Sequence, residues 1–585
     1  MKPFRVECLN TTNGIAIASL LALPLLLASA SLTFASSFQR LVDRVDSPPA
    51  ARLIDGVWKR ILPAKYGKLT FTVDPSIPRP RLHFHVGSDP GSEGGTVRFE
   101  ISILPKGQAP TIVFQRDVRI HGWEEQEVDL SGLDLEDAQI VLRKRLIDGP
   151  RKRLFTSFWG DPVILSRGSP PSSGSVVLIS LDTLRADYVG AYGNRKVHTP
   201  VLDSLAGSGI LYEYAYSPSS WTLPSHASLF YGRFLASIPR PNQRGPDGAG
   251  PMQSLAEIFR GSGYLTAGFT GGGYVSKTFG FHRGFDTYFT FHPPNATGNP
   301  CPPDRFDGPL VFEQAQNWLR KRGNVPFFLF LHTYDIHDRC PFRIPGAAPP
   351  HAWRKLGTEG RERLRTYYRE LVQRTDQRVG ELLNVIKDLG IEETTLIIVT
   401  SDHGEAFWEH GVRGHGCRPP PYEEIVRVPL ILRDPSRLEP SVRISEPVSL
   451  IDVAPTVLAL KNLPRRSWMQ GKRLPGSGLG GAGIPRAVFS QCGDRLAVRL
   501  DHHKLITSRS GANPDELYDL DRDGAEKHNL VEEKPQIAAR LQEQAAHYWK
   551  MTEAGKNEEP RQPDSQERLD DETKEQLRAL GYLGE

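Results

Sequence analysis

Short stretches in which apolar and polar residues alternate fill the chain from about residue 69 to residue 159. Residues 69–73, 81–86 and 97–101 show this pattern, and segments rich in Gly, Pro and Asp separate them. A period of two is typical of strands with one buried face, and several such strands predict a β-sandwich. We expect an N-terminal β-sandwich domain over residues 36–165. It would serve as a packing or spacer module, with carbohydrate binding as the alternative.

Continuous apolar runs replace this alternation after residues 166–175, a linker rich in Ser, Gly and Pro. The runs at 176–181, 325–331 and 396–400 are typical of strands that are buried on both faces of a parallel sheet. Between the last two, apolar residues recur every three or four positions from Leu364 to Ile386, which predicts a long helix. Strands that alternate with helices predict an α/β domain with a mainly parallel sheet over residues 176–485.

The two ends of the chain differ from this central part. Within residues 1–35, Lys2 and Arg5 precede an uncharged apolar run. This pattern predicts an export signal, with an uncleaved membrane anchor as the alternative. We therefore expect the protein outside the cytoplasm, whether periplasmic, secreted or membrane-anchored. Residues 486–550 contain short alternating runs that predict a small antiparallel subdomain, and residues 551–585 are predicted to be a polar tail with a short terminal helix.

The net charge narrows the class of partner that the chain can bind. The formal net charge is only +4 over 585 residues, and no dense block of Lys and Arg occurs. The chain therefore offers no electrostatic basis for binding nucleic acid.

Beyond residue 35 an even number of cysteines remains, which permits two disulfides or, equally, unpaired thiols. These cysteines are Cys301, Cys340, Cys417 and Cys492.

Polar side chains of the kind that bind metals or attack esters stand next to the predicted buried elements. Asp182 directly follows the run 176–181, and Asp402 and His403 follow the run 396–400. Ligand sites in such sheets form beyond the carboxyl ends of the strands, so these residues are candidate metal ligands. Thr222 precedes Pro224 and an apolar-periodic run. Its hydroxyl is therefore predicted at a helix N-terminus, where backbone amides favour an anion.

Each of these segments alone is also typical of an ordinary turn or helix cap, but their order and spacing together are specific. The sequences DTLRAD at 182–187, TLPSH at 222–226 and SDHGE at 401–405 resemble the sulfatase family, as do GHG at 414–416, SLIDVAPTV at 449–457 and ELYDL at 516–520. The resemblance spans about residues 176–530. It implies an alkaline-phosphatase-like domain, a mixed, mainly parallel sheet between helices, which here follows the β-sandwich and precedes the small antiparallel subdomain.

The resemblance also implies roles for individual residues. The implied metal ligands are Asp182, Thr222, Asp402 and His403, and Thr222 matches the position of the nucleophile. The implied substrate-binding residues are His226, Asp335, His337, His415 and, by its place in the sequence, Lys277. His337 and His415 are also expected to act in catalysis, on the departing alcohol. One or two of His332, His410 and His415 are expected only to hydrogen-bond loops, His410 above all.

The chain departs from the sulfatase pattern at the nucleophile. Sulfatases that form formylglycine carry Cys or Ser where this chain has Thr222, and Thr is not a substrate for that modification. A Thr at this position resembles the phosphodiesterases, phosphoethanolamine transferases and lipoteichoic acid synthases of the superfamily. Thr183 also replaces the second Asp of the sulfatase pair. The remaining ligand set suits Mn²⁺, Mg²⁺ or Zn²⁺ better than Ca²⁺, which stays an alternative.

The expected activity is cleavage of a sulfate or phosphate ester through a covalent intermediate on Thr222, in a sulfated or phosphorylated small molecule, glycan or lipid. One alternative is a phosphodiesterase or phosphotransferase that acts on a lipid or glycan headgroup. A second is a non-catalytic glycan-binding protein. Cys340 follows His337 closely and Cys417 follows His415. If both histidines face one site, a Cys340–Cys417 disulfide would join their loops.

Overall fold

The computed structural model describes most of the chain between Phe38 and Lys556. The described residues are 38–44, 50–54, 57–62, 67–89, 94–119, 122–150, 156–166, 174–235, 239, 250–291, 307–322, 325–337, 356–416, 419–478, 486–556, 574 and 577. The predicted export signal, the predicted Cys340–Cys417 pair and most of the predicted tail lie outside them. Among the described helices, none combines the length and the apolar character needed to span a membrane.

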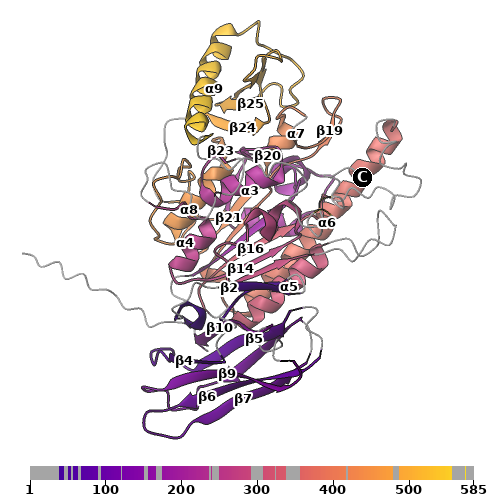
Figure 1. The fold of residues 1–585 in the computed structure, drawn as a ribbon. Helices are drawn as coiled ribbons and strands as arrows, with labels where there is room; N and C mark the ends of the chain where they lie inside the picture. The colour runs from indigo at the N-terminus through magenta and orange to yellow at the C-terminus, as the bar shows by residue number, and fades with distance from the viewer. Residues whose placement is uncertain are drawn as a thin grey trace, which may run out of the picture.

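Parallel strands form the middle of a large sheet (Figure 1). β11 (Ser175–Leu181) lies between β16 (Phe327–Thr333) and β17 (Thr395–Thr400) and runs parallel to both. On one side follow β14 (Leu265–Thr270) and β15 (Thr287–Thr290), and on the other β21 (Leu430–Arg433), β12 (Ile210–Tyr212) and β22 (Val442–Ile444). β21 is antiparallel to both of its neighbours. The predicted mixed, mainly parallel sheet is therefore confirmed. Every residue of its three central strands is buried, which explains their nearly continuous apolar runs.

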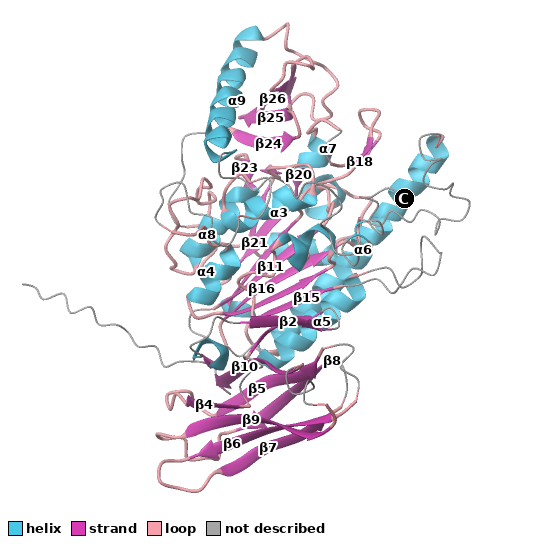
Figure 2. Cartoon of the chain, in the orientation of Figure 1, coloured by secondary structure: helices cyan, strands magenta, loops and turns pink. Residues whose placement is uncertain are grey.

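Helices cover both faces of this sheet (Figure 2). Val177 and Ile179 of β11 share a core with α2 (Pro200–Gly207), α5 (Gly308–Arg322) and α6 (Thr358–Asp388). Val176 and Leu178 share a second core with α3 (Thr222–Tyr231), α4 (Leu255–Gly261) and α8 (Val453–Leu460). Successive side chains of a strand point to opposite faces, so β11 takes part in both cores.

The N-terminal strands form two sheets packed face to face, and one of these sheets is continuous with the central one. Beyond β15 the large sheet continues through β3 (Val57–Ile61), β10 (Ser157–Ser166), β5 (Pro80–Ser88) and β8 (Gly122–Asp129), with β1 (Phe38–Arg40) and β2 (Ala50–Ile54) paired to β10 and β3. The facing sheet contains β4 (Lys68–Thr72), β9 (Gln139–Asp148), β6 (Thr96–Leu104) and β7 (Thr111–Val118). Apolar side chains such as Phe84, Phe99 and Trp159 form the core between them.

The continuity of the large sheet depends on β3, which pairs antiparallel with β15. This pairing protects an edge strand that would otherwise expose its backbone groups. The sequence pattern places a linker at 166–175 but cannot show that strands on either side of it share a sheet. The predicted domain boundaries stay predictions.

The C-terminal part contains the predicted antiparallel sheet and a helix that the strand pattern did not predict. The strands are β24 (Val488–Cys492), β25 (Arg495–Leu500), β26 (His503–Ser508) and β27 (Glu516–Asp519), paired in that order. α9 (Pro535–Lys556) packs against them through Ala538, Leu541, Ala545 and Tyr548. These four residues are spaced three or four positions apart, which is the signal in the sequence from which α9 could have been predicted. α9 also continues past residue 550, into the predicted tail of residues 551–585.

Short elements complete the fold around the carboxyl ends of the central strands. β13 (Ala215–Tyr216), β20 (Arg427–Val428) and β23 (Val448–Ser449) form a small sheet, next to the short helix α7 (Glu423–Val426). β18 (Ala406–Phe407) and β19 (Arg413–Gly414) form a hairpin directly after the SDHGE segment.

Candidate functional site

The ends of two neighbouring strands and the start of one helix bring the predicted metal ligands together. Asp182 follows β11, and Asp402 and His403 follow β17, the strand paired beside it. Thr222 is the first residue of α3. Ser180 of β11 is in register with Thr400 of β17, so the two strands end at the same level of the sheet. All four predicted metal ligands are fully buried.

These side chains converge closely. One potential ligand atom from each of Asp182, Asp402 and His403 lies within 4.8 Å of the others. The Thr222 hydroxyl oxygen lies 3.3 Å from Asp182 Oδ2 and 3.3 Å from His403 Nε2. The geometry therefore brings together the four residues that the sequence marked as metal ligands.

The chemistry of this cluster fits a divalent cation. Asp182 Oδ1 and Asp402 Oδ2 are buried, and neither has a hydrogen-bond partner among the described residues. Burial, followed by the charge of Asp402, raises the pKa of the Asp182 carboxyl well above its ordinary value. Two buried carboxylates at close range are unfavourable unless a cation or protons balance their charge. A metal ion bound by these oxygens and an imidazole nitrogen would supply that balance.

A second layer of polar side chains supports the cluster. His332 Nε2 lies 3.2 Å from Asp182 Oδ2. His226 Nδ1 lies 2.9 Å from the Thr222 carbonyl oxygen and 3.5 Å from Asp402 Oδ2, while its Nε2 lies 2.9 Å from Ser180 Oγ. Both ring nitrogens of His226 therefore contact other groups of the protein. The predicted contact of His226 with substrate stays a prediction.

His332 and Ser180 belong to this layer, although the sequence motifs did not place either residue in the site. Both could have been found from the strand pattern, because Ser180 is directly in register with His332 on the neighbouring parallel strand β16. Polar residues at the carboxyl end of two adjacent buried strands lie beside each other by geometry.

The turn that carries Asp182 has an unusual backbone. Thr183 has φ = 59°, a left-handed conformation that is strained for a β-branched residue. Tyr368, from the long helix α6, donates its hydroxyl hydrogen to the Thr183 carbonyl oxygen at 2.6 Å and accepts a hydrogen bond from the Arg185 amide at 3.1 Å. α6 thus fixes the turn from behind.

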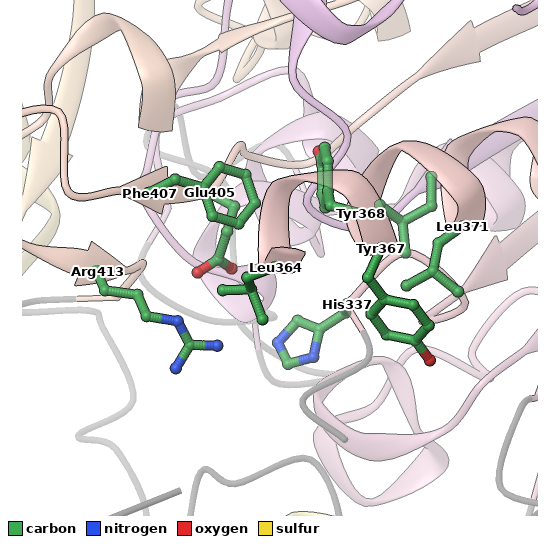
Figure 3. A pocket seen from close by; sticks show the side chains of 9 residues that line it. His337, Leu364, Tyr367, Tyr368, Leu371, Glu405, Phe407 and Arg413 are labelled. Carbon is green, nitrogen blue, oxygen red and sulfur yellow. The ribbon is translucent and has the colours of Figure 1, made fainter. Parts of the chain in front are cut away.

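His337 and His415 lie together beside His403 of the cluster. Their Nε2 atoms are 3.3 Å apart, and the His415 ring centroid lies 4.4 Å from that of His403. His337 also borders a cavity of about 20 Å³, which is room for about one water molecule. Figure 3 shows His337 in this pocket with Glu405, Arg413 and Tyr367.

The described contacts of two other predicted substrate-binding residues lead elsewhere. Asp335 accepts a hydrogen bond from the Gly308 amide at the start of α5 and pairs with Arg378 of α6. Lys277 Nζ lies 5.9 Å from the ring of Trp58 in the N-terminal strand β3. None of the contacts described for these two residues is with the Thr222 cluster, and their predicted roles stay predictions.

His410 holds loops together, as expected from the sequence. Its Nδ1 is 2.8 Å from Glu424 Oε1, its Nε2 is 3.0 Å from the Glu526 carbonyl oxygen, and its ring stacks on Tyr422. Both ring nitrogens are engaged by the protein, so His410 has no lone pair directed at the cluster.

Comparison with known proteins shows which family the central domain resembles. A family model described as Sulfatase matches residues 175–463. An ulvan-active sulfatase from Formosa agariphila is 25% identical over an alignment that covers 52% of this chain and 65% of that protein, slightly less than two thirds of its length. Arylsulfatase A from Homo sapiens is 26% identical, with coverage of 63% and 84%.

The fold agrees with this match. The phosphonate monoester hydrolase of Agrobacterium radiobacter superposes with a TM-score of 0.52 at 19% identity, covering 66% of this chain and 96% of that one. This likeness shows that the two proteins share a fold. Residues 175–463, slightly less than half of the chain, match the sulfatase family model and form its alkaline-phosphatase-like domain.

Proposed function

We propose that this protein is a metal-dependent hydrolase that cleaves a sulfate or phosphate ester through a covalent intermediate on Thr222. The observation that carries the proposal is the position of the Thr222 hydroxyl, 3.3 Å from both Asp182 Oδ2 and His403 Nε2 at the first turn of α3. The backbone amides of a helix N-terminus favour both the alkoxide and the oxyanion that is transferred to it.

Asp182, Asp402 and His403 would hold the metal ion, together with the Thr222 oxygen. When bound, a divalent ion lowers the pKa of a hydroxyl and neutralises sulfate or phosphate oxygens. Mn²⁺, Mg²⁺ and Zn²⁺ are the proposed ions, with Ca²⁺ as the alternative.

The hydrogen bonds of His403 support this arrangement. His403 Nδ1 lies 2.9 Å from the Gly404 carbonyl oxygen, which can only accept, so Nδ1 carries the hydrogen. In the neutral ring Nε2 therefore presents a lone pair toward Thr222. This nitrogen is placed either to act as a metal ligand or to accept the hydroxyl proton.

His337 and His415 supply the second half of the chemistry. As the Thr222 oxygen bonds to sulfur or phosphorus, the bond to the departing alcohol breaks, and a protonated imidazole gives its proton to that oxygen. A water molecule then releases the group from Thr222. An acceptor alcohol in place of water would make the protein a transferase.

The substrate class is proposed from the family and the nucleophile together. The match to the sulfatase family favours a sulfate ester of a small molecule, glycan or lipid. Thr222 in place of the formylglycine precursor favours phosphoryl chemistry, which keeps a phosphodiesterase or phosphotransferase as the second candidate. The retained cluster of Asp182, Thr222, Asp402 and His403 argues against a glycan-binding protein without catalysis.

A substrate panel tests the proposal. The protein, freed of metal and reloaded separately with Mn²⁺, Mg²⁺, Zn²⁺ or Ca²⁺, would be assayed with 4-nitrophenyl sulfate, 4-nitrophenyl phosphate, bis(4-nitrophenyl) phosphate and a 4-nitrophenyl phosphonate. We expect metal-dependent turnover of at least one ester. Absence of turnover with all four esters and all four metals would rule out an ester hydrolase of this kind.

A further inference from the structure

Glu405 reaches the candidate catalytic histidines although nothing in the family comparison assigns it a role. Its Oε2 lies 2.8 Å from His415 Nδ1, and His415 Nε2 lies 3.3 Å from His337 Nε2. The His415 side chain is fully buried, and the Glu405 side chain is 12% exposed. The three side chains thus form a continuous line, and its two ends, Glu405 and His337, both line the pocket in Figure 3.

The hairpin that follows the SDHGE segment holds this line in place. Ala406 pairs with Gly414 and Phe407 pairs with Arg413, so the residues just outside the hairpin, Glu405 and His415, lie opposite each other. Ala406 and Phe407 are buried and anchor the hairpin in two apolar clusters. Gly414, the last residue of β19, has φ = 92°, a conformation that favours glycine, and it turns the chain directly before His415.

The direction of the hydrogen bonds follows from the chemistry of the groups. An ionised carboxylate can only accept, so His415 Nδ1 must carry a hydrogen. In the neutral ring, Nε2 then carries a lone pair that faces His337. When His415 is protonated, Nε2 carries a hydrogen and offers it in the same direction. The contact with Glu405 therefore favours this tautomer and this ring orientation.

We propose that Glu405 is a positioning residue, which fixes the ring of His415 so that its Nε2 proton is directed at the oxygen of the departing alcohol. The inference rests on the proposed function, because it presupposes ester cleavage. In the step concerned, the bond from sulfur or phosphorus to the leaving oxygen breaks, its electron pair stays on that oxygen, and the proton passes there from His415 Nε2.

The test uses the dependence of rate on the leaving group. Substrates with a good leaving group such as 4-nitrophenolate need little protonation, whereas phenyl and alkyl esters need it most. In Glu405→Ala we expect kcat/KM to fall only a few-fold for the 4-nitrophenyl ester and by about 10²-fold for the poorest leaving group, because general acid catalysis contributes about 10²–10⁴-fold. Glu405→Gln keeps an acceptor oxygen and should lie between wild type and Glu405→Ala.

The same region of the chain offers a matched control. Glu424 makes an equivalent bond of 2.8 Å to His410, whose other nitrogen faces a backbone carbonyl instead of the site. Glu424→Gln should lower activity, if at all, by the same factor for every leaving group. An equal loss across the series in Glu405→Ala, or a loss of bound metal that accounts for its defect, would overturn the inference.

A spectroscopic readout separates this inference from the proposed function. In protein labelled with ¹⁵N-histidine, with the His415 signal assigned by its absence in His415→Gln, we expect the Nδ1–H tautomer in wild type and its loss in Glu405→Ala. An unchanged tautomer would overturn the positioning role whether or not the protein turns over any ester. If the substrate panel fails but the tautomer shifts, the proposed function falls and the positioning of His415 stands.

Discussion

Tyr368 on α6 provides a sharp test of how the fold holds the candidate metal centre. Its hydroxyl makes two hydrogen bonds to the turn that follows Asp182, one to the Thr183 carbonyl and one from the Arg185 amide. Tyr368→Phe removes both and keeps the ring. We expect lower stability and weaker metal binding, because the turn that carries Asp182 loses its support.

The magnitude follows from what the substitution leaves behind. Tyr368 is 4% exposed, and the Thr183 and Arg185 side chains around the turn are also buried. A buried donor or acceptor left without a partner costs about 1–3 kcal/mol, so two such groups cost on the order of 3 kcal/mol. The left-handed conformation of Thr183 stores a further strain of about 1–3 kcal/mol, which the freed turn can release by moving Asp182.

Thermal unfolding and metal analysis of the same preparations measure both effects. A loss of this size corresponds to a fall in Tm of about 5 °C or more. Tyr188→Phe is the matched control, since its ring packs against Tyr368 at 4.7 Å and the described hydrogen bonds of the turn do not involve its hydroxyl. Adding Thr183→Gly, which adopts positive φ without strain, should restore part of the lost metal affinity. A Tyr368→Phe protein with the Tm and metal content of Tyr188→Phe would refute the reasoning.

Two further predictions concern charge. Removal of divalent metal with a chelator should lower the Tm of wild type. Relative to protein with free metal at a hundred times its Kd, the free energy of unfolding should fall by about 2.7 kcal/mol. Asp402→Asn should show no such difference, and a wild type insensitive to metal would contradict the proposed site. At Glu526, burial outweighs the attraction of Lys504 and raises the pKa to about 7 from an ordinary value of 4.5. Its contribution to stability is therefore full below about pH 4.5 and is lost as the pH rises through 7. Glu526→Gln should gain stability relative to wild type above pH 7, and parallel stability curves from pH 5 to pH 8 would contradict this.

The sequence was sufficient for the parts of the fold that local patterns encode. Nearly continuous apolar runs predicted β11, β16 and β17, and the residues just after β11 and β17 proved to lie together because parallel strands end at one edge of the sheet. The start of α3 at Thr222 followed from Pro224 and the apolar period behind it.

What the sequence could not show depends on contacts between distant segments. The pairing of β3 with β15 joins residues more than 200 positions apart, and nothing in either strand specifies the partner. The support of the Asp182 turn by Tyr368 is equally remote, since in the sequence Tyr368 is simply one apolar position in the period of α6. The Glu405–His415 contact was easier to predict, because a hairpin between these two residues would have placed their side chains opposite each other.

Turnover by Thr222→Ala, measured with its metal content on the same preparation, tests the central claim most directly. Three of the four proposed ligands remain in this variant, so its metal content should stay close to that of wild type, while turnover of any ester that the wild type cleaves should fall by orders of magnitude. Thr222→Ser should keep part of the activity, and Ser220→Ala, which removes a hydroxyl that bonds the Gly416 carbonyl at 2.8 Å, should keep most of it. Near-normal turnover by metal-loaded Thr222→Ala would contradict the covalent mechanism and favour direct attack by water on the ester.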